Sequence, residues 1–304
     1  MVFYVFTLLT MAYLWLVGAR RRRLQAGPVS LVYYRIGRKN GEPWILLHGL
    51  GSVAASWGPV LRRLRRHCDM VVPELSSLGG SSIDGVAGGG LGVRQGAEVA
   101  ARLIEAEFGG RPVTVVGISL GGWLATRLAL ERPELVSRLV LIDAGGYRHQ
   151  DWDEIERLVR VHDMADVDEL YRALFVKAPW IMRLSKAGFL KAYTSPAVTG
   201  VLDGLTEEDT FDDGDLGRLR MPVALLWGEK DGLFRVDAAR AMAAALPDGT
   251  LEVLPGCGHA LHIEHPRRLA AALRKIRTRT ARPVPAVPIV PTASDTPRRS
   301  PSSA

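Results

Sequence analysis

Short apolar runs alternate with helix-forming segments through the middle of the chain. Runs typical of buried strands occupy residues 31–34, 44–47, 70–72, 113–118, 138–142, 223–227 and 251–254. Segments with helical character lie between or after them, at 54–66, 93–108, 122–131, 238–246 and 267–277. This alternation predicts an α/β fold with a mostly parallel central sheet and helices on both of its faces.

The alternation stops between about residues 147 and 215. Four helix candidates follow one another there without a strand-like run, at 153–163, 166–176, 180–193 and 196–205. An all-helical insertion at this point predicts a lid over the carboxyl edge of the sheet, where open α/β folds bind ligands. Its apolar residues either line a substrate channel or pack the insertion onto the sheet: Trp180, Ile181, Met182, Phe189 and Leu190.

The N-terminal segment from Val2 to Ala19 contains no charged side chain and is followed by Arg20–Arg23. As a helix it would reach roughly 27 Å, enough to cross a hydrocarbon core. A cleaved signal peptide is the alternative, but its charges would precede the apolar run. We therefore expect a transmembrane helix that makes the protein a membrane-anchored, single-pass protein, with the arginines and the catalytic domain on the cytoplasmic side.

These features divide the chain into five expected parts. Residues 1–23 form the membrane anchor and its basic flank, 24–146 the first part of the core, and 147–215 the helical lid. Residues 216–280 complete the core, and the Pro-rich tail at 281–304 is expected to be disordered.

Composition suits one globular domain with appendages, since 47% of the 304 residues are hydrophobic and 23% are charged. The net charge of +7 is concentrated in Arg20–Arg23, 62–66 and 267–299, and no recognised nucleic-acid module accompanies it. We therefore expect no nucleic-acid partner. Two cysteines, Cys68 and Cys257, make no disulfide framework and are expected to be buried thiols.

The segment Gly117-Ile118-Ser119-Leu120-Gly121 lies between a predicted strand and a predicted helix. A serine flanked by glycines in this setting predicts a nucleophile elbow, a turn so tight that both flanking positions favour glycine. The alternative is a glycine-rich loop carrying an idle serine.

A serine hydroxyl needs a base to remove its proton, and the base needs an acid to orient it. Asp231 and His259 follow two later strands, so the order Ser119, Asp231, His259 predicts a catalytic triad. Asp143, which ends the strand before the insertion, is the rival acid. Glu229 would point elsewhere on the Asp231 loop, and His262 and His265 are expected to cap or pack the following helix.

Acyl transfer also needs hydrogen-bond donors for the developing oxyanion. The turn His48-Gly49-Leu50-Gly51 follows a strand, and we assign the donors to the backbone N–H groups of Leu50 and Leu120. His48 is expected to hold this loop. The chemistry calls for no cofactor and no metal ion.

The motifs together resemble the α/β-hydrolase fold family over roughly residues 30–280. They are His48–Gly51, Gly117–Gly122, Trp227–Asp231, and Gly258-His259 with Glu264-His265-Pro266. One segment departs from the family, which often has Asp-x-Pro-Gly-x-Gly-x-Ser where this chain has Glu74-Leu75-Ser76-Ser77-Leu78-Gly79-Gly80-Ser81. Only Gly79 and Ser81 fit that pattern.

The resemblance is to the serine esterase and monoacylglycerol-lipase-type branch, because Ser119 excludes the dehalogenase and epoxide-hydrolase branches, which use aspartate. It implies hydrolysis of a carboxylic ester, such as a lipid monoester, through an acyl-enzyme on Ser119. One alternative is a carbon–carbon bond hydrolase of aromatic degradation, although those enzymes usually carry Trp where this chain has Ala260. A non-catalytic hydrolase scaffold that binds a ligand or partner is the other.

Overall fold

The computed structural model describes residues 12–83, 89–180, 182 and 186–278. In this part of the chain, nine strands form one sheet in the order β1-β2-β4-β3-β6-β7-β8-β9, with β5 beside β2. The strands are β1 (Arg20–Ala26), β2 (Val29–Gly37), β3 (Glu42–Leu47), β4 (Cys68–Pro73), β5 (Ser82–Ile83), β6 (Val113–Ile118), β7 (Val136–Ile142), β8 (Val223–Gly228) and β9 (Gly249–Leu254).

Pairing is parallel from β4 through β3, β6, β7 and β8 to β9, and antiparallel where β2 meets β1, β4 and β5. The prediction of a mostly parallel sheet is therefore confirmed. Because parallel strands share a direction, β3, β6, β8 and β9 all end at one edge, and the loops carrying the candidate residues meet there.

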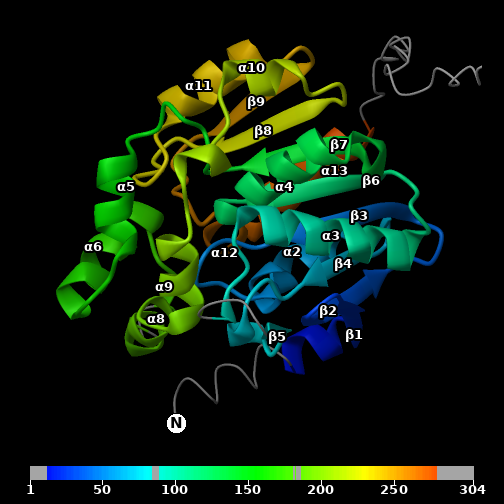
Figure 1. Cartoon of the computed structure of the whole chain (residues 1–304), viewed down its shortest axis with the longest axis horizontal. Coiled ribbons are helices and arrows are strands. Elements are labelled where there is room, and N and C mark those ends of the chain that lie inside the picture. The colour runs from blue at the N-terminus through cyan, green and yellow to red at the C-terminus, as the bar shows by residue number, and fades with distance from the viewer. Residues whose placement is uncertain (1–11, 84–88, 181, 183–185, 279–304) are drawn as a thin grey trace, which may run out of the picture.

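Helices cover both faces of the sheet (Figure 1). On one face lie α3 (Val93–Phe108), α4 (Leu120–Glu131) and α11 (Val236–Ala245), and on the other α2 (Gly58–Leu64) and α13 (Pro266–Thr278). Neighbouring strand residues alternate between two buried clusters, so that Ile45 and Leu47 face one side and Trp44 and Leu46 the other. This period of two is what a strand buried on both faces requires.

Between β7 and β8 the chain forms a helical insertion without a strand of the sheet. It contains α5 (Trp152–Val159), α6 (Met164–Leu174), α8 (Lys186–Tyr193), α9 (Pro196–Asp203) and α10 (Asp213–Gly217). Figure 1 shows α5, α6, α8 and α9 grouped at one end of the sheet. The predicted helix at 153–163 ends earlier, because Asp163 caps the next helix by accepting from the N–H groups of Ala165 and Asp166.

The N-terminal segment departs from the sequence prediction. Only residues 12–16 of its described part are helical; a turn follows at Val17 and Gly18, and β1 begins at Arg20. Leu14 and Val17 are 1% and 5% exposed and belong to the core cluster shared with α2 and α13. Residues 2–11 of the expected span lie outside the described residues.

Within the described ranges, none of the helices combines the length and the apolar character needed to cross a membrane. The prediction of a single-pass membrane anchor, and the cytoplasmic placement drawn from it, is therefore wrong. The physical reason is that Leu14, Val17 and Ala19, just before β1, are buried against the domain's own core. The arginine run forms an edge strand paired with β2, in which Arg22 makes an ion pair with Glu107.

Two further sequence predictions concern the cysteines and the C-terminal tail. Cys68 and Cys257 are both buried and unpaired, as expected. The tail predicted to be disordered, at 281–304, lies outside the described residues.

Two neighbouring substitutions test the packing of the N-terminal segment. Leu14→Ala removes a buried side chain and should lower the free energy of unfolding by about 2–5 kcal/mol. Trp15 is 74% exposed, so Trp15→Ala should change it by less than about 0.5 kcal/mol. Denaturant unfolding of both variants checks this; equal effects would contradict the packing of Leu14 in the core.

Candidate active site

Ser119 lies on the turn between β6 and α4, with backbone angles φ 55° and ψ −124°. A Cβ on Gly117 would stand 2.2 Å from the carbonyl oxygen of Gly121, and a Cβ on Gly121 would stand 2.3 Å from that of Leu47. Both positions must therefore be glycine. The Ser119 carbonyl accepts from the N–H groups of Gly122 and Trp123. The turn has the form of the predicted nucleophile elbow, with the serine in a strained conformation.

The loops after β8 and β9 bring Asp231 and His259 together. The Nδ1 atom of His259 lies 2.9 Å from Oδ2 of Asp231, and both residues are buried. Oδ1 of the same carboxylate accepts from the N–H groups of Leu233 and Phe234, each at 2.8 Å. A carboxylate only accepts, so Nδ1 carries the proton and Nε2 is left as an acceptor.

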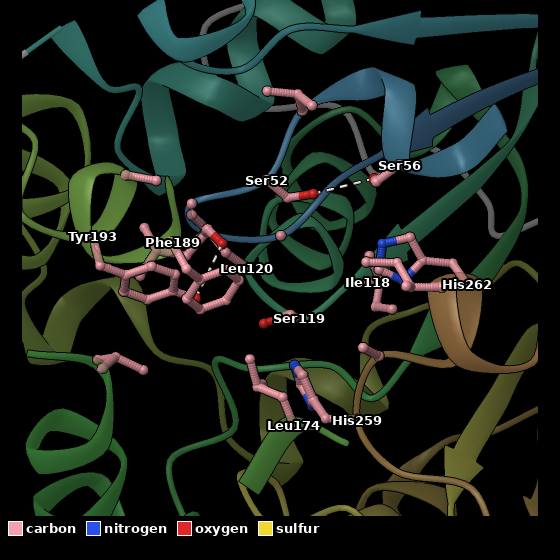
Figure 2. Close-up of a pocket in the computed structure, with 18 of the residues that line it drawn as sticks. Ser52, Ser56, Ile118, Ser119, Leu120, Leu174, Phe189, Tyr193, His259 and His262 are labelled. Atoms are coloured by element: carbon pink, nitrogen blue, oxygen red, sulfur yellow. Dashed lines mark hydrogen bonds between the residues drawn. The ribbon is translucent and has the colours of Figure 1, made fainter. Parts of the chain in front are cut away.

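Ser119 and His259 border the same cavity, whose volume is about 500 Å³. Figure 2 shows Ser119 in the middle of this cavity with the imidazole of His259 next to it. The sequence-predicted serine, acid and base thus come from three loops at one edge of the sheet. This arrangement has the parts needed for nucleophilic attack assisted by a general base.

The predicted oxyanion donors also border this cavity. Leu50 lies on the turn after β3, and Leu120 is the first residue of α4. Neither backbone N–H donates to an acceptor within the part of the chain that the structure describes. Both N–H groups are therefore free to donate a hydrogen bond to a ligand oxygen.

His48 holds the turn that carries Leu50. Its Nε2 accepts from the N–H of Leu75 at 3.0 Å, so its Nδ1 donates to the carbonyl of Gly49 at 2.9 Å. Burial lowers the pKa of His48 to about 4, which keeps the ring neutral and both bonds in place. The predicted structural role of His48 fits these contacts.

Asp143, the rival acid, lies elsewhere in the hydrogen-bond network. Its Oδ1 accepts from the N–H of Gly228 at 2.7 Å, while His259 pairs with Asp231. Complete burial raises the pKa of Asp143, and the charge of Asp231 adds to this effect. Asp143 therefore binds the backbone of Gly228, and Asp231 is the partner that orients the histidine.

Three further acidic or basic residues have structural contacts. Glu229 accepts from the N–H of Gly256, and Glu264 accepts from the N–H groups of Gly258 and Lys177, which holds the His259 loop. His262 is buried and packs on Trp57 at 5.2 Å between ring centroids, but it also borders the cavity. Packing was the expectation for His262, whereas its contact with the cavity was not foreseen.

Sequence reasoning also missed Tyr13, Ser52, Ser56 and Glu74 as residues bordering the cavity. Glu74 stands at the departure from the family pattern, which was the one available signal. Its Oε2 accepts from the N–H of Ala54 at 2.9 Å, and burial raises its pKa to about 7. Tyr13 gave no signal, because it belonged to the segment expected to lie in a membrane.

Within the described residues, no group of three or more His, Cys, Asp or Glu side chains could hold a metal ion. The polar groups that the structure brings together near Ser119 are an imidazole, a carboxylate and two backbone N–H groups. That set is suited to acyl transfer.

Comparison with known proteins gives the class to which this site belongs. Residues 44–272 match the model of the alpha/beta hydrolase family, so the chain belongs to that family. It is 28% identical to a pimeloyl-(acyl-carrier protein) methyl ester esterase of Chromobacterium violaceum, over 77% of this chain and 93% of that protein. It is 24% identical to human monoacylglycerol lipase ABHD6, over 84% of this chain and 81% of that protein.

Among solved structures, a membrane phospholipase A described as a bacterial virulence factor matches with a TM-score of 0.78 and 24% identity. The match covers 91% of this chain and 92% of the other. At this identity the likeness shows the fold alone. The relatives named esterase and lipase support ester hydrolysis as the general activity of this chain.

The turn itself can be tested with two glycine substitutions. Gly121→Ala places a methyl group against the Leu47 carbonyl and should destabilise the protein by about 1–3 kcal/mol or more. Nothing lies within 4 Å of a Cβ at Gly217, so Gly217→Ala should be neutral or mildly stabilising. Thermal unfolding compares the two; an undisturbed Gly121→Ala protein would contradict the close approach of β3 and the elbow.

The burial of His262 predicts a pH effect on stability. Its pKa falls from 6.5 to about 3 on folding because burial disfavours the charged ring. Between these values the unfolded chain binds the proton and the folded protein does not, so acidification destabilises the fold by up to about 1.4 kcal/mol per pH unit. His262→Leu should lose less stability than the parent across this range in urea titrations at several pH values. Parallel curves would rule out a neutral buried ring.

Proposed function

We propose that this protein is a serine hydrolase that cleaves carboxylic esters through an acyl-enzyme on Ser119. The observation that carries the proposal is the His259–Asp231 pair, bonded at 2.9 Å, on the cavity into which the strained Ser119 projects. The esterase and lipase relatives support the same reaction class.

In the proposed mechanism, Nε2 of His259 takes the proton from the Ser119 hydroxyl as its oxygen attacks the ester carbonyl. Asp231 keeps the proton on Nδ1 and stabilises the imidazolium that forms. The oxyanion accepts hydrogen bonds from the N–H groups of Leu50 and Leu120. Each such donor is worth roughly 3–4 kcal/mol in the transition state.

Collapse of the tetrahedral intermediate breaks the bond to the alcohol, whose oxygen takes the proton from His259. The acyl group stays on Ser119. A water molecule then attacks the acyl-enzyme, with His259 again as the base, and releases the carboxylic acid and the free serine. His259 passes the first proton to the alcohol and the second, taken from water, back to Ser119, so the reaction needs no cofactor.

The helical insertion is proposed to act as the lid of this site. Its residues Ile155, Val159, Leu174, Phe189, Leu202 and Leu205 border the cavity, so apolar surface covers the region beside Ser119. Apolar walls favour an acyl chain over a charged or strongly hydrated one. An ester with a substantial acyl chain, such as a lipid monoester, is the substrate class we propose.

Ser119→Ala should abolish labelling by a fluorophosphonate probe and lower p-nitrophenyl ester turnover by a factor on the order of 10⁴ or more. Exposed Ser137 supplies the control, since Ser137→Ala should label and turn over as the parent does. Circular dichroism establishes that each variant is folded.

Asp231→Asn tests the role of the acid. It should keep the fold and lower turnover by a factor on the order of 10⁴, because the tautomer of His259 is no longer held. Full probe labelling of Ser119→Ala, or full turnover by Asp231→Asn, would overturn the proposed function.

A further inference from the structure

The turn that follows β3, here called the Leu50 turn (residues 48–54), is held at both ends by one dipeptide. At its start, Nε2 of His48 accepts from the N–H of Leu75 at 3.0 Å. At its end, the N–H of Ala54 donates to Oε2 of Glu74 at 2.9 Å. Neighbouring residues of the segment after β4 thus anchor both ends of the turn.

Between these two anchors the turn makes few hydrogen bonds of its own. Among the described residues, the N–H groups of Leu50, Gly51 and Val53 donate to no acceptor. The N–H of Ser52 donates to the carbonyl of Gly49 at 3.3 Å, which is a long bond. A segment with so few internal bonds keeps one conformation only where its ends are fixed. The position of the Leu50 N–H therefore depends on the two anchors.

The first anchor acts on the peptide unit that supplies the proposed oxyanion donor. Nδ1 of His48 donates to the carbonyl of Gly49 at 2.9 Å. That carbonyl and the N–H of Leu50 belong to the same planar trans peptide, so the two groups point in opposite directions. Holding the carbonyl therefore sets the direction of the N–H, and successive hydrogen bonds of this kind polarise one another.

The second anchor is a carboxyl with little freedom to move. Glu74 is 2% exposed, and a Cβ at position 79 would overlap its carboxyl, so Gly79 leaves the room that the side chain needs. Within the described ranges the N–H of Ala54 is the only hydrogen-bond donor to this carboxyl. Burying a carboxyl is costly unless it is hydrogen-bonded. The bond to Ala54 is therefore the contact through which Glu74 acts on its surroundings.

We propose that Glu74 is a positioning residue for ester hydrolysis: through Ala54 it holds the Leu50 turn so that the N–H of Leu50 meets the oxyanion. This inference rests on the proposed ester hydrolysis. Stabilisation of an oxyanion depends on donors placed where its charge develops. A displacement of about 1 Å can lower a rate by a factor on the order of 10².

The test compares an ester with its thionoester, in which sulfur replaces the carbonyl oxygen and the acyl chain and alcohol are unchanged. Sulfur is larger and accepts hydrogen bonds weakly, so a well-placed pair of donors favours the ester. A displaced donor reduces that preference. A variant that is only partly folded loses both activities by the same factor, so the ratio of the two kcat/KM values reports the placement of the donor.

Glu74→Ala removes the acceptor, and Glu74→Asp withdraws it by one methylene group. Each should lower kcat/KM for the ester by about 10- to 100-fold, mainly through kcat, and lower the ester-to-thionoester ratio by at least about threefold. Glu74→Gln keeps an oxygen within reach of Ala54, so its ratio should stay within about twofold of the parent's. Circular dichroism shows which variants are folded, and Glu74→Asp decides alone if Glu74→Ala is unfolded.

Asp212→Ala is the matched control, because it removes another carboxylate that accepts from a backbone N–H, that of Asp215 at the start of α10. It should leave the ratio unchanged. An unchanged ratio in the folded Ala and Asp variants of Glu74, or an equal fall in Glu74→Gln, would overturn this inference and leave ester hydrolysis intact. Failure of the parent to cleave the ester or to react with the fluorophosphonate probe would overturn the proposed function as well.

Discussion

The close approach of backbone to backbone at the turn after β6 is the constraint on which the rest of the site depends. Glycine at 117 and 121 lets the chain reverse within van der Waals distance of the carbonyl of Leu47, where a Cβ has no room. That approach places Leu50 and Leu120 on the same cavity as Ser119. The strain at Ser119 is offset by the parallel strands that hold the turn from both sides.

Burial decides the charge of the groups around this turn. His48 and His262 are kept neutral because the surrounding apolar residues disfavour the protonated ring, and the buried carboxyls of Glu74 and Asp143 have raised pKa values for the same reason. Asp231 instead accepts hydrogen bonds from two backbone N–H groups and pairs with His259.

The N-terminal segment shows how one pattern permits two structures. An uncharged apolar run followed by arginines is what a membrane span would look like, but Leu14 and Val17 are buried in the domain core and the arginines form an edge strand. Hydropathy reports only how strongly a side chain avoids water, and burial in a membrane or in a protein core removes it from water equally well. The same segment carries Tyr13 to the cavity wall, a role no local pattern could indicate.

The sequence by itself determined the alternating fold, because buried strands and helices follow different hydrophobic patterns. It also predicted the tight turn at Ser119 and the meeting of Asp231 with His259, because glycine spacing reports a steric requirement and strand ends in a parallel sheet share one edge. Tertiary structure alone decided what surrounds them. Packing placed His262 against Trp57 on the wall of the cavity, and placed the carboxyl of Glu74 on the N–H of Ala54. Such contacts join residues far apart in the chain, so no local pattern contains them.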